Sequence, residues 1–182
     1  MLLPISRHNA GFLAIDYISQ KCGASVDRSK FKALVGEARI GSRRVLLMKP
    51  QTMMNASGDA VIEAANFYKI PLENIIVISD DVNLDVGRMR VRKSGSDGGQ
   101  KGLRSIITRF GKDSFPRLRI GVGKKPHPDY DMVDWVLGEF SDKDKKILFE
   151  VFGVVYEGVE KMLSGDIDGA MQICNGAKMD QV

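Results

Sequence analysis

The stretch Ile75-Ile76-Val77-Ile78-Ser79-Asp80-Asp81 places four consecutive apolar side chains directly before three polar ones. A short apolar run that stops at polar residues is typical of a buried strand. Val45-Leu46-Leu47-Met48, followed by Lys49-Pro50, has the same form and predicts a second buried strand. In α/β proteins, ligands bind in the crevice at the carboxyl ends of such strands. Asp80 is therefore a candidate functional residue.

Helical patterns alternate with these strands. Residues 12–21 form a mostly apolar run that ends before Gly23, and apolar side chains in 61–68 recur at i, i+3, i+4 and i+7. Further along, Ser141-x-x-Asp144 resembles a capping box that opens a long helix. The alternation predicts an α/β fold with helices packed on a sheet, in a single domain over residues 1–182.

Composition narrows the class of protein. The chain has 182 residues, a net charge of +4 and no run of about 18 apolar residues, so we expect no membrane segment. The two cysteines, Cys22 and Cys174, show neither a disulfide pattern nor metal-ligand spacing. We therefore expect a cytoplasmic protein without a metal or cofactor, whose mild positive charge favours an anionic partner.

Basic side chains alternate with apolar ones along two further predicted strands, so each strand would carry guanidinium groups on one face. Between them, Gly95-Ser96-Asp97-Gly98-Gly99-Gln100-Lys101-Gly102 leads into a helical pattern. A glycine-rich loop at a helix N-terminus exposes N–H groups that bind anions. Together these features favour anion binding over solvated strand faces and an ordinary turn. The arginines concerned are Arg88, Arg90, Arg92, Arg117 and Arg119.

Arg7-His8-Asn9-Ala10-Gly11 contains one of the two histidines and opens an apolar run, whereas His127 lies in a proline-flanked loop. Imidazole transfers protons near neutral pH, so His8 is the candidate for acid–base chemistry. A histidine that only packs or hydrogen-bonds near a helix start remains the alternative. An Asp80 carboxylate beside His8 would fix the imidazole tautomer and raise the basicity of its other nitrogen, provided that folding brings the two together. Because there is no Gly-x-Ser-x-Gly motif, the pair would activate water directly.

Five segments occur in an order that resembles bacterial-type peptidyl-tRNA hydrolase. The similarity continues through Trp135-Val136-Leu137-Gly138-Glu139-Phe140-Ser141 to the C-terminal helix, and so covers nearly the whole chain. The segments are Arg7–Gly11, Pro50-Gln51-Thr52-Met53-Met54-Asn55-Ala56-Ser57-Gly58, the strand ending at Asp80, Gly95–Leu103 and Phe115-Pro116-Arg117-Leu118-Arg119-Ile120-Gly121-Val122-Gly123.

The resemblance implies a monomeric α/β domain with a twisted, mixed and mostly parallel sheet. It also implies hydrolysis of the ester that joins a peptide to the 3′ end of tRNA, which recycles tRNA from prematurely released peptidyl-tRNA. By position, His8 matches the catalytic histidine and Asp80 its orienting carboxylate. Asn55 matches a residue that contacts substrate near the terminal adenosine, and Met54 lines that pocket. Arg92 and Arg119 match the two positions that clamp a tRNA phosphate.

The sequence departs from the family pattern in two places. Relatives begin with an apolar strand and a Gly-x-x-Asn-Pro-Gly loop, whereas this chain starts seven residues before His8. We therefore expect a domain that lacks the first strand, either because the gene product starts upstream or because the chain is truncated. The alternative is that another segment fills the position of that strand. Gln100-Lys101 stands where many relatives have His-Asn, and Lys101 would bind phosphate or stabilise an oxyanion.

Two other functions remain open at this point. One is a tRNA-binding protein of the same fold whose catalysis is impaired by the altered N-terminus and the Gln100-Lys101 pair. The other is a small-molecule esterase, which would show no salt-dependent binding of RNA.

Overall fold

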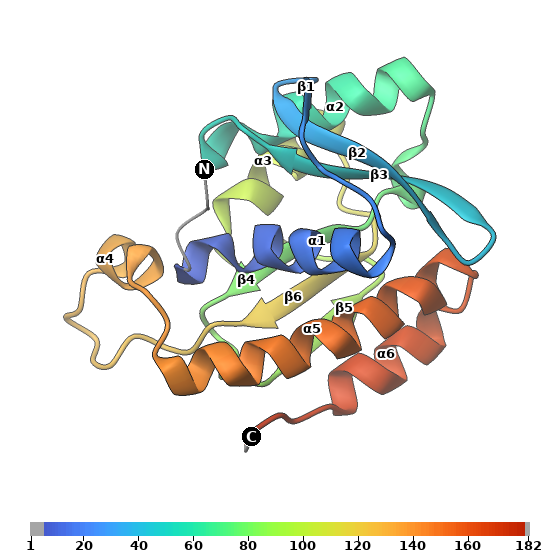
Figure 1. The fold of residues 1–182 in the computed structure, drawn as a ribbon. Coiled ribbons are helices and arrows are strands. Elements are labelled where there is room, and N and C mark those ends of the chain that lie inside the picture. Colours follow the sequence, from blue (N-terminus) through green and yellow to red (C-terminus); the bar gives the residue numbers. More distant parts are fainter. Residues whose placement is uncertain (1–5, 181–182) are drawn as a thin grey trace. The chain divides into compact units, whose positions relative to one another are not determined.

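The computed structural model describes residues 6–180, which form two compact units. Of the described residues, the first unit comprises 6–14, 78–91 and 118–180, and the second comprises Ile15–Val77 and Arg92–Arg117. In chain order (Figure 1) the elements are η1 (Arg7–Asn9), α1 (Ala10–Lys21), β1 (Arg28–Lys30), β2 (Ala33–Ile40), β3 (Arg43–Pro50), η2 (Met54–Ala56), α2 (Ser57–Tyr68), η3 (Leu72–Asn74), β4 (Val77–Asp81), β5 (Met89–Arg92), α3 (Lys101–Phe110), β6 (Arg117–Gly121), α4 (Met132–Leu137), α5 (Asp142–Leu163) and α6 (Ile167–Gly176).

One sheet has the strand order β4-β6-β5. Its β4–β6 pair is parallel, because Val77 N donates to Pro116 O and Val122 N donates to Asp81 O, each at 3.1 Å. Gly121 N donates to Arg88 O at 2.9 Å, which joins the end of β6 to the start of β5, as in an antiparallel pair. The expected α/β class with a mixed sheet is confirmed.

Two long helices belong to the first unit. Helix α5 begins where the capping pattern predicts, since Ser141 Oγ accepts a hydrogen bond from Asp144 N at 3.1 Å. Its apolar stripe of Leu148, Val151, Val155 and Val159 is buried. Helix α6 runs alongside α5 (Figure 1), and a Cβ on Gly158 would lie 2.5 Å from Cys174 Sγ.

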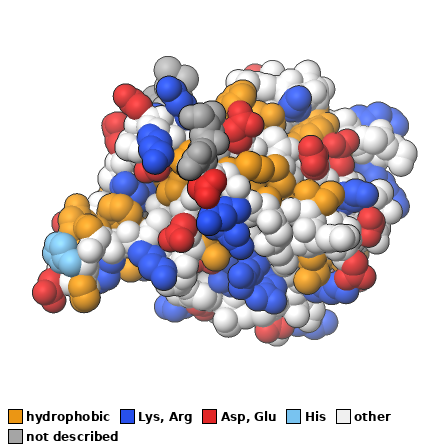
Figure 2. Space-filling view, turned by 90° about the horizontal axis from the view of Figure 1, so that it is seen from below, with side chains coloured by type: hydrophobic (Ala, Val, Ile, Leu, Met, Phe, Trp, Pro, Cys, Tyr) orange, Lys and Arg blue, Asp and Glu red, His pale blue; other side chains and the backbone are white. Residues whose placement is uncertain are grey.

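The face seen in Figure 2 intersperses Lys and Arg with Asp and Glu, so it does not carry a single sign of charge.

The second unit contains the antiparallel sheet β1-β2-β3, whose long hairpin pairs Ala33 with Pro50 and Ile40 with Arg43. The predicted strand at 45–48 is confirmed as part of β3. Strand β2 was not among the predicted strands, because Gly36 and the charged Glu37 interrupt its apolar pattern. Gly36 is needed there, since any Cβ would meet the carbonyl oxygen of Ser25.

The N-terminal expectation lies outside the described residues, which begin at Ser6. The single domain lacking its first strand therefore stays a prediction. Among the helices between residues 6 and 180, none has the length and apolar character that crossing a membrane requires.

The two cysteines provide a test of the packing between α5 and α6. Burial raises the pKa of the Cys174 thiol to about 11, and Glu157 acts in the same direction. At pH 8 the folded protein therefore holds Cys174 as a buried neutral thiol, whereas Cys22 is only half-buried. We expect a thiol-exchange reagent to titrate one cysteine in the native protein and two in denaturant. Rapid native reaction of Cys174, scored with a Cys22→Ser variant, would contradict this packing.

Candidate active site

His8 lies on a short 3₁₀ turn, η1, that leads directly into α1. The first turn of α1 lies against β4, because a Cβ on Gly11 would come within 2.5 Å of the carbonyl oxygen of Ile78. Only a residue without a side chain allows this approach of helix to strand. The contact brings His8 next to Asp80, which follows Ile78 by two positions on β4.

The structure thus brings the two sequence-predicted catalytic candidates together. His8 Nδ1 lies 3.6 Å from Asp80 Oδ1, and the side chains are 25% and 5% exposed. That separation is longer than a hydrogen bond, but catalytic contacts commonly tighten only when substrate binds. Nδ1 itself is buried, so the exposed quarter of the imidazole lies on the other atoms of the ring. The buried carboxylate is thus the acidic group that faces Nδ1.

Arg7 anchors the turn that carries His8. Its backbone N–H donates to Gly138 O at 3.2 Å, and its guanidinium carbon lies 3.6 Å from the ring centroid of Trp135. Nη1 also donates to Trp135 O at 3.3 Å. Burial lowers the pKa of Arg7, while the carboxylate of Asp144 opposes that shift. The sequence analysis did not foresee this role, although Trp135 is the single tryptophan of the chain.

The substrate-binding candidates Met54, Asn55 and Lys101 gather in the second unit. Met54 and Asn55 lie on η2, and η2 packs on α3, whose first residue is the exposed Lys101. Gln100 Nε2 donates to Met54 Sδ at 3.6 Å, and a Cβ on Gly102 would lie 2.7 Å from the same sulfur. The three residues that the resemblance assigns to one substrate pocket are therefore neighbours in the fold.

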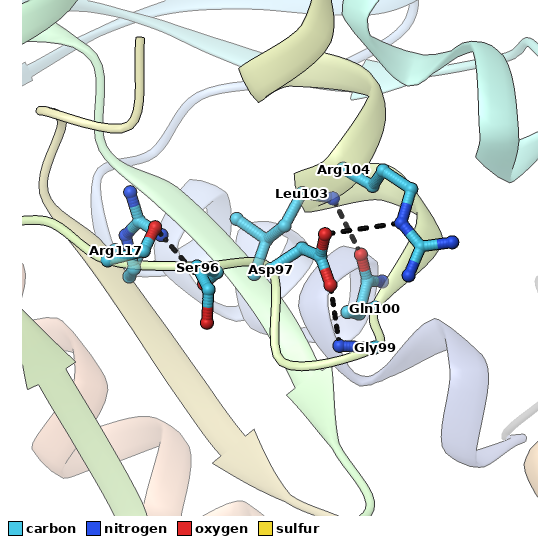
Figure 3. Close-up of polar contacts among 8 residues, drawn as sticks. Ser96, Asp97, Gly99, Gln100, Leu103, Arg104 and Arg117 are labelled. Atoms are coloured by element: carbon cyan, nitrogen blue, oxygen red, sulfur yellow. Dashed lines mark hydrogen bonds and ion pairs between the residues drawn. The ribbon is translucent and has the colours of Figure 1, made fainter.

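In the glycine-rich loop before α3, side-chain oxygens of the loop itself accept hydrogen bonds from its backbone N–H groups (Figure 3). Asp97 Oδ1 accepts from Gly99 N at 2.7 Å, and Asp97 Oδ2 pairs with Arg104 Nε at 3.2 Å. Gln100 Oε1 caps α3 by accepting from Leu103 N at 2.8 Å. The prediction that this loop offers its N–H groups to an external anion is therefore wrong for Gly99 and Leu103.

Arg117, predicted to lie on an anion-binding strand face, is instead fully buried. Its Nη1 donates to the carbonyl oxygen of Gly95 at 2.6 Å. Nη1 also donates to the carbonyl oxygen of Ser96 at 3.2 Å (Figure 3). Nη2 donates to Asp113 O at 2.5 Å and Nε to Phe115 O at 3.2 Å. The prediction is wrong because backbone carbonyl oxygens, two nearby in the chain and two in the loop before α3, satisfy the guanidinium, which holds that loop in place.

The phosphate-binding candidates occupy different environments. Arg92 is exposed at the end of β5, where the predicted alternation is confirmed by buried Met89 and Val91. Arg119 is 17% exposed, and its Nη1 lies 3.7 Å from Asp81 Oδ2. Arg92 belongs to the second unit and Arg119 to the first, so their joint clamp stays a prediction.

Within residues 6–180, no group of three His, Cys, Asp or Glu side chains is arranged to hold a metal ion.

A Gly11→Ala variant tests the helix–strand contact. The added methyl group must push α1 away from β4, so we expect a loss of about 1–3 kcal/mol in the free energy of unfolding. His8 moves with the helix, so activity should fall as well. Gly176→Ala is the matched control, because nothing lies within 4 Å of a Cβ there. Equal stability and activity of the two variants would contradict the contact.

An Arg117→Met variant tests the buried guanidinium. It leaves buried carbonyl oxygens without donors, and we expect about 2–4 kcal/mol of lost stability in denaturant unfolding. The amide protons of Gly99 and Leu103 should exchange faster, because the loop loses its support. The exposed Arg104 is the control, and Arg104→Gln should change stability by less than about 1 kcal/mol. Arg117→Met that unfolds like the parent chain would refute this role.

Comparison with known proteins identifies relatives of the whole chain. Residues 5–182 match the family model described as peptidyl-tRNA hydrolase. The chain is 52% identical to the peptidyl-tRNA hydrolase of Caldicellulosiruptor bescii over 171 residues, which cover 94% of this chain and 89% of that protein. It is 48% identical to the corresponding protein of Caldanaerobacter subterraneus, with 94% and 91% covered.

Solved structures show the same fold. The crystal structure of peptidyl-tRNA hydrolase from Acinetobacter baumannii matches with a TM-score of 0.90 at 30% identity, covering 97% of this chain and 89% of that one. A crystal structure of a peptidyl-tRNA hydrolase in complex with N-propanol matches with the same TM-score, identity and coverage.

Proposed function

Since the chain belongs to the peptidyl-tRNA hydrolase family, we propose that it hydrolyses peptidyl-tRNA with a water molecule activated by His8 and Asp80. The bond cleaved is the ester between the peptide and tRNA, and the products are a free peptide and a reusable tRNA. The observation that carries the mechanism is the approach of His8 Nδ1 to Asp80 Oδ1 at 3.6 Å, across 72 positions of sequence. 

In this mechanism His8 acts as the general base. Asp80 keeps the proton on Nδ1, so that Nε2 carries the lone pair that accepts a proton from water. The resulting hydroxide attacks the ester carbonyl carbon, and the imidazolium then protonates the departing ribose oxygen. The burial of Asp80, 5% exposed, favours this arrangement because few water molecules compete for its carboxylate.

Asn55, Met54 and Lys101 would serve the substrate. The amide of Asn55 and the ammonium of Lys101 are donors suited to a developing oxyanion or to a nearby phosphate. Met54 would supply apolar contact to the terminal adenosine. The packing of η2 on α3, and the contact of Gln100 with Met54 Sδ, support a single pocket for these residues. Lys101 would take the place of the asparagine common in relatives.

Arg92 and Arg119 would bind a phosphate of tRNA. Arg92 is exposed and ready to contact the backbone of RNA. Asp81 holds Arg119 in an ion pair, which orients the guanidinium but also offsets part of its charge. We expect Arg92 to contribute more than Arg119 to the salt dependence of tRNA binding.

The alternatives are less well supported. Relatives at about half identity across most of the chain bear the hydrolase name, which favours an active enzyme over a tRNA-binding protein with impaired catalysis. The same relatives favour peptidyl-tRNA over a small ester as the substrate. We further propose that the enzyme acts as a monomer in the cytoplasm and requires no metal or cofactor.

Single-turnover hydrolysis of an N-acetylated aminoacyl-tRNA tests the proposal. His8→Ala should lower kcat by about 10²–10⁴-fold, the range for loss of a general base, with KM changed little. Asp80→Asn should lower kcat less, but by at least about 10-fold, because the tautomer is no longer fixed. His127→Ala is the control and should keep full activity, since His127 is exposed and packs on Tyr130. Unchanged kcat in His8→Ala would refute the mechanism.

A further inference from the structure

One face of the antiparallel sheet in the second unit is only half covered. Ala33 and Val35 on β2 are buried with Phe31 against Ala60 and Ala64 of α2. Side chains at alternate positions share a face, so Glu37 and Arg39 continue the same face beyond the covered half. Both are exposed, and Figure 1 shows the β2–β3 hairpin extending away from α2.

The uncovered half is strongly basic. Strand register places Arg39 directly opposite Arg44 of β3 and Arg28 of β1 directly opposite Val35, so all three arginines share this face with Glu37. Glu37 is engaged twice, with Arg44 Nη2 at 3.3 Å and Arg28 Nη2 at 3.9 Å. The surface has three guanidinium groups and one carboxylate. Arg43 pairs with Ile40 and therefore lies on the opposite face of the sheet. We call Arg28, Arg39 and Arg44 the arginine face.

The charges on this face are not balanced. Like charges directly opposite each other on antiparallel strands are destabilising, and Arg39 faces Arg44 in that way. Glu37 offsets part of this repulsion by pairing with Arg44 and Arg28, but one carboxylate does not neutralise three guanidinium groups. The face therefore keeps a net positive charge in contact with solvent, which attracts anions.

The chemistry of the surface fits a nucleic-acid backbone better than a protein partner. Guanidinium groups bind phosphate oxygens through paired N–H donors, and arrays of arginine recognise repeated phosphates. The hot spots of protein interfaces combine arginine with tryptophan and tyrosine in well-packed, desolvated pockets. None of the exposed large apolar side chains in the described part of the chain lies on β1, β2 or β3.

We propose that the arginine face binds backbone phosphates in the body of the tRNA substrate, separately from the ester-binding site. The inference rests on peptidyl-tRNA being the substrate. Its contribution is to affinity for full-length tRNA, not to the chemical step, so it acts through KM and through the salt dependence of binding.

Two variants and a control test the arginine face. Arg39→Gln with Arg44→Gln removes two cations, and Lys112→Gln with Lys161→Gln removes two exposed cations elsewhere. Each chain is assayed on N-acetylated aminoacyl-tRNA and on the same ester carried by a short oligonucleotide. Binding of deacylated tRNA is measured across a series of salt concentrations.

The double arginine variant should raise KM for the full-length substrate about 3- to 30-fold and leave the short ester unaffected. The slope of log affinity against log salt should become shallower by about 1 to 2, as expected for the loss of one or two phosphate contacts. Arg39→Glu supplies an independent test, because it places a carboxylate directly opposite Arg44, where the two charges attract. It should raise the thermal unfolding midpoint while weakening tRNA binding, and a purely structural role would not produce these opposite effects.

Three results would overturn the proposal. The first is a KM and salt slope in the double arginine variant that equal those of the lysine control. The second is an equal loss on both substrates, which would locate the effect at the ester site. The third is unchanged tRNA binding by Arg39→Glu. Hydrolysis of the short ester by the parent chain reports on the proposed function alone, so the two failures are distinguishable.

Discussion

The approach of α1 to β4 is the constraint on which the active site depends. Gly11 lets the helix backbone lie against the carbonyl of Ile78, and this single contact sets His8 opposite Asp80. The stacking of Arg7 on Trp135 and its bond to Gly138 fix the other side of the same turn. The backbone on both sides of His8 is thereby fixed by contacts of its neighbours, and this is the preorganisation that the proposed general-base role requires.

Arginine has several roles in this protein, and burial with its partners distinguishes them. Arg117 is fully buried and is satisfied by backbone carbonyls, so it shapes the loop before α3. Arg119 is largely buried against the carboxylate of Asp81 and is oriented by it. Arg92 and the arginine face are exposed, where guanidinium groups can meet phosphates. The net charge of +4 therefore does not show which arginines are buried and paired and which are exposed to a binding partner.

Much of the fold was predictable because, in strongly periodic segments, the local sequence pattern is enough to predict a helix or a strand. The apolar run in β3, the arginine alternation in β5 and the Ser141 cap are of this kind, and all are confirmed. The strand predicted at 75–78 exists, but it lies at Val77–Asp81 and includes the polar residues expected to follow it. The short β1, the interrupted β2 and the helices α4 and α6 gave no comparable signal. The His8–Asp80 pair was named from residue chemistry, but only tertiary packing at Gly11 brings the two together. Burial of Arg117 depends in part on the carbonyls of Gly95 and Ser96, more than twenty positions away in the chain, which no local pattern encodes.

The tautomer of His8 tests the central claim most directly. With two histidines in the chain, ¹⁵N NMR of the imidazole nitrogens can be assigned with a single His127→Ala variant. The account predicts that neutral His8 carries its proton on Nδ1, and that Asp80→Asn shifts the population toward the Nε2–H form. A neutral His8 protonated on Nε2 in the parent chain would contradict this account. So would a tautomer population that is unchanged in the Asp80→Asn variant.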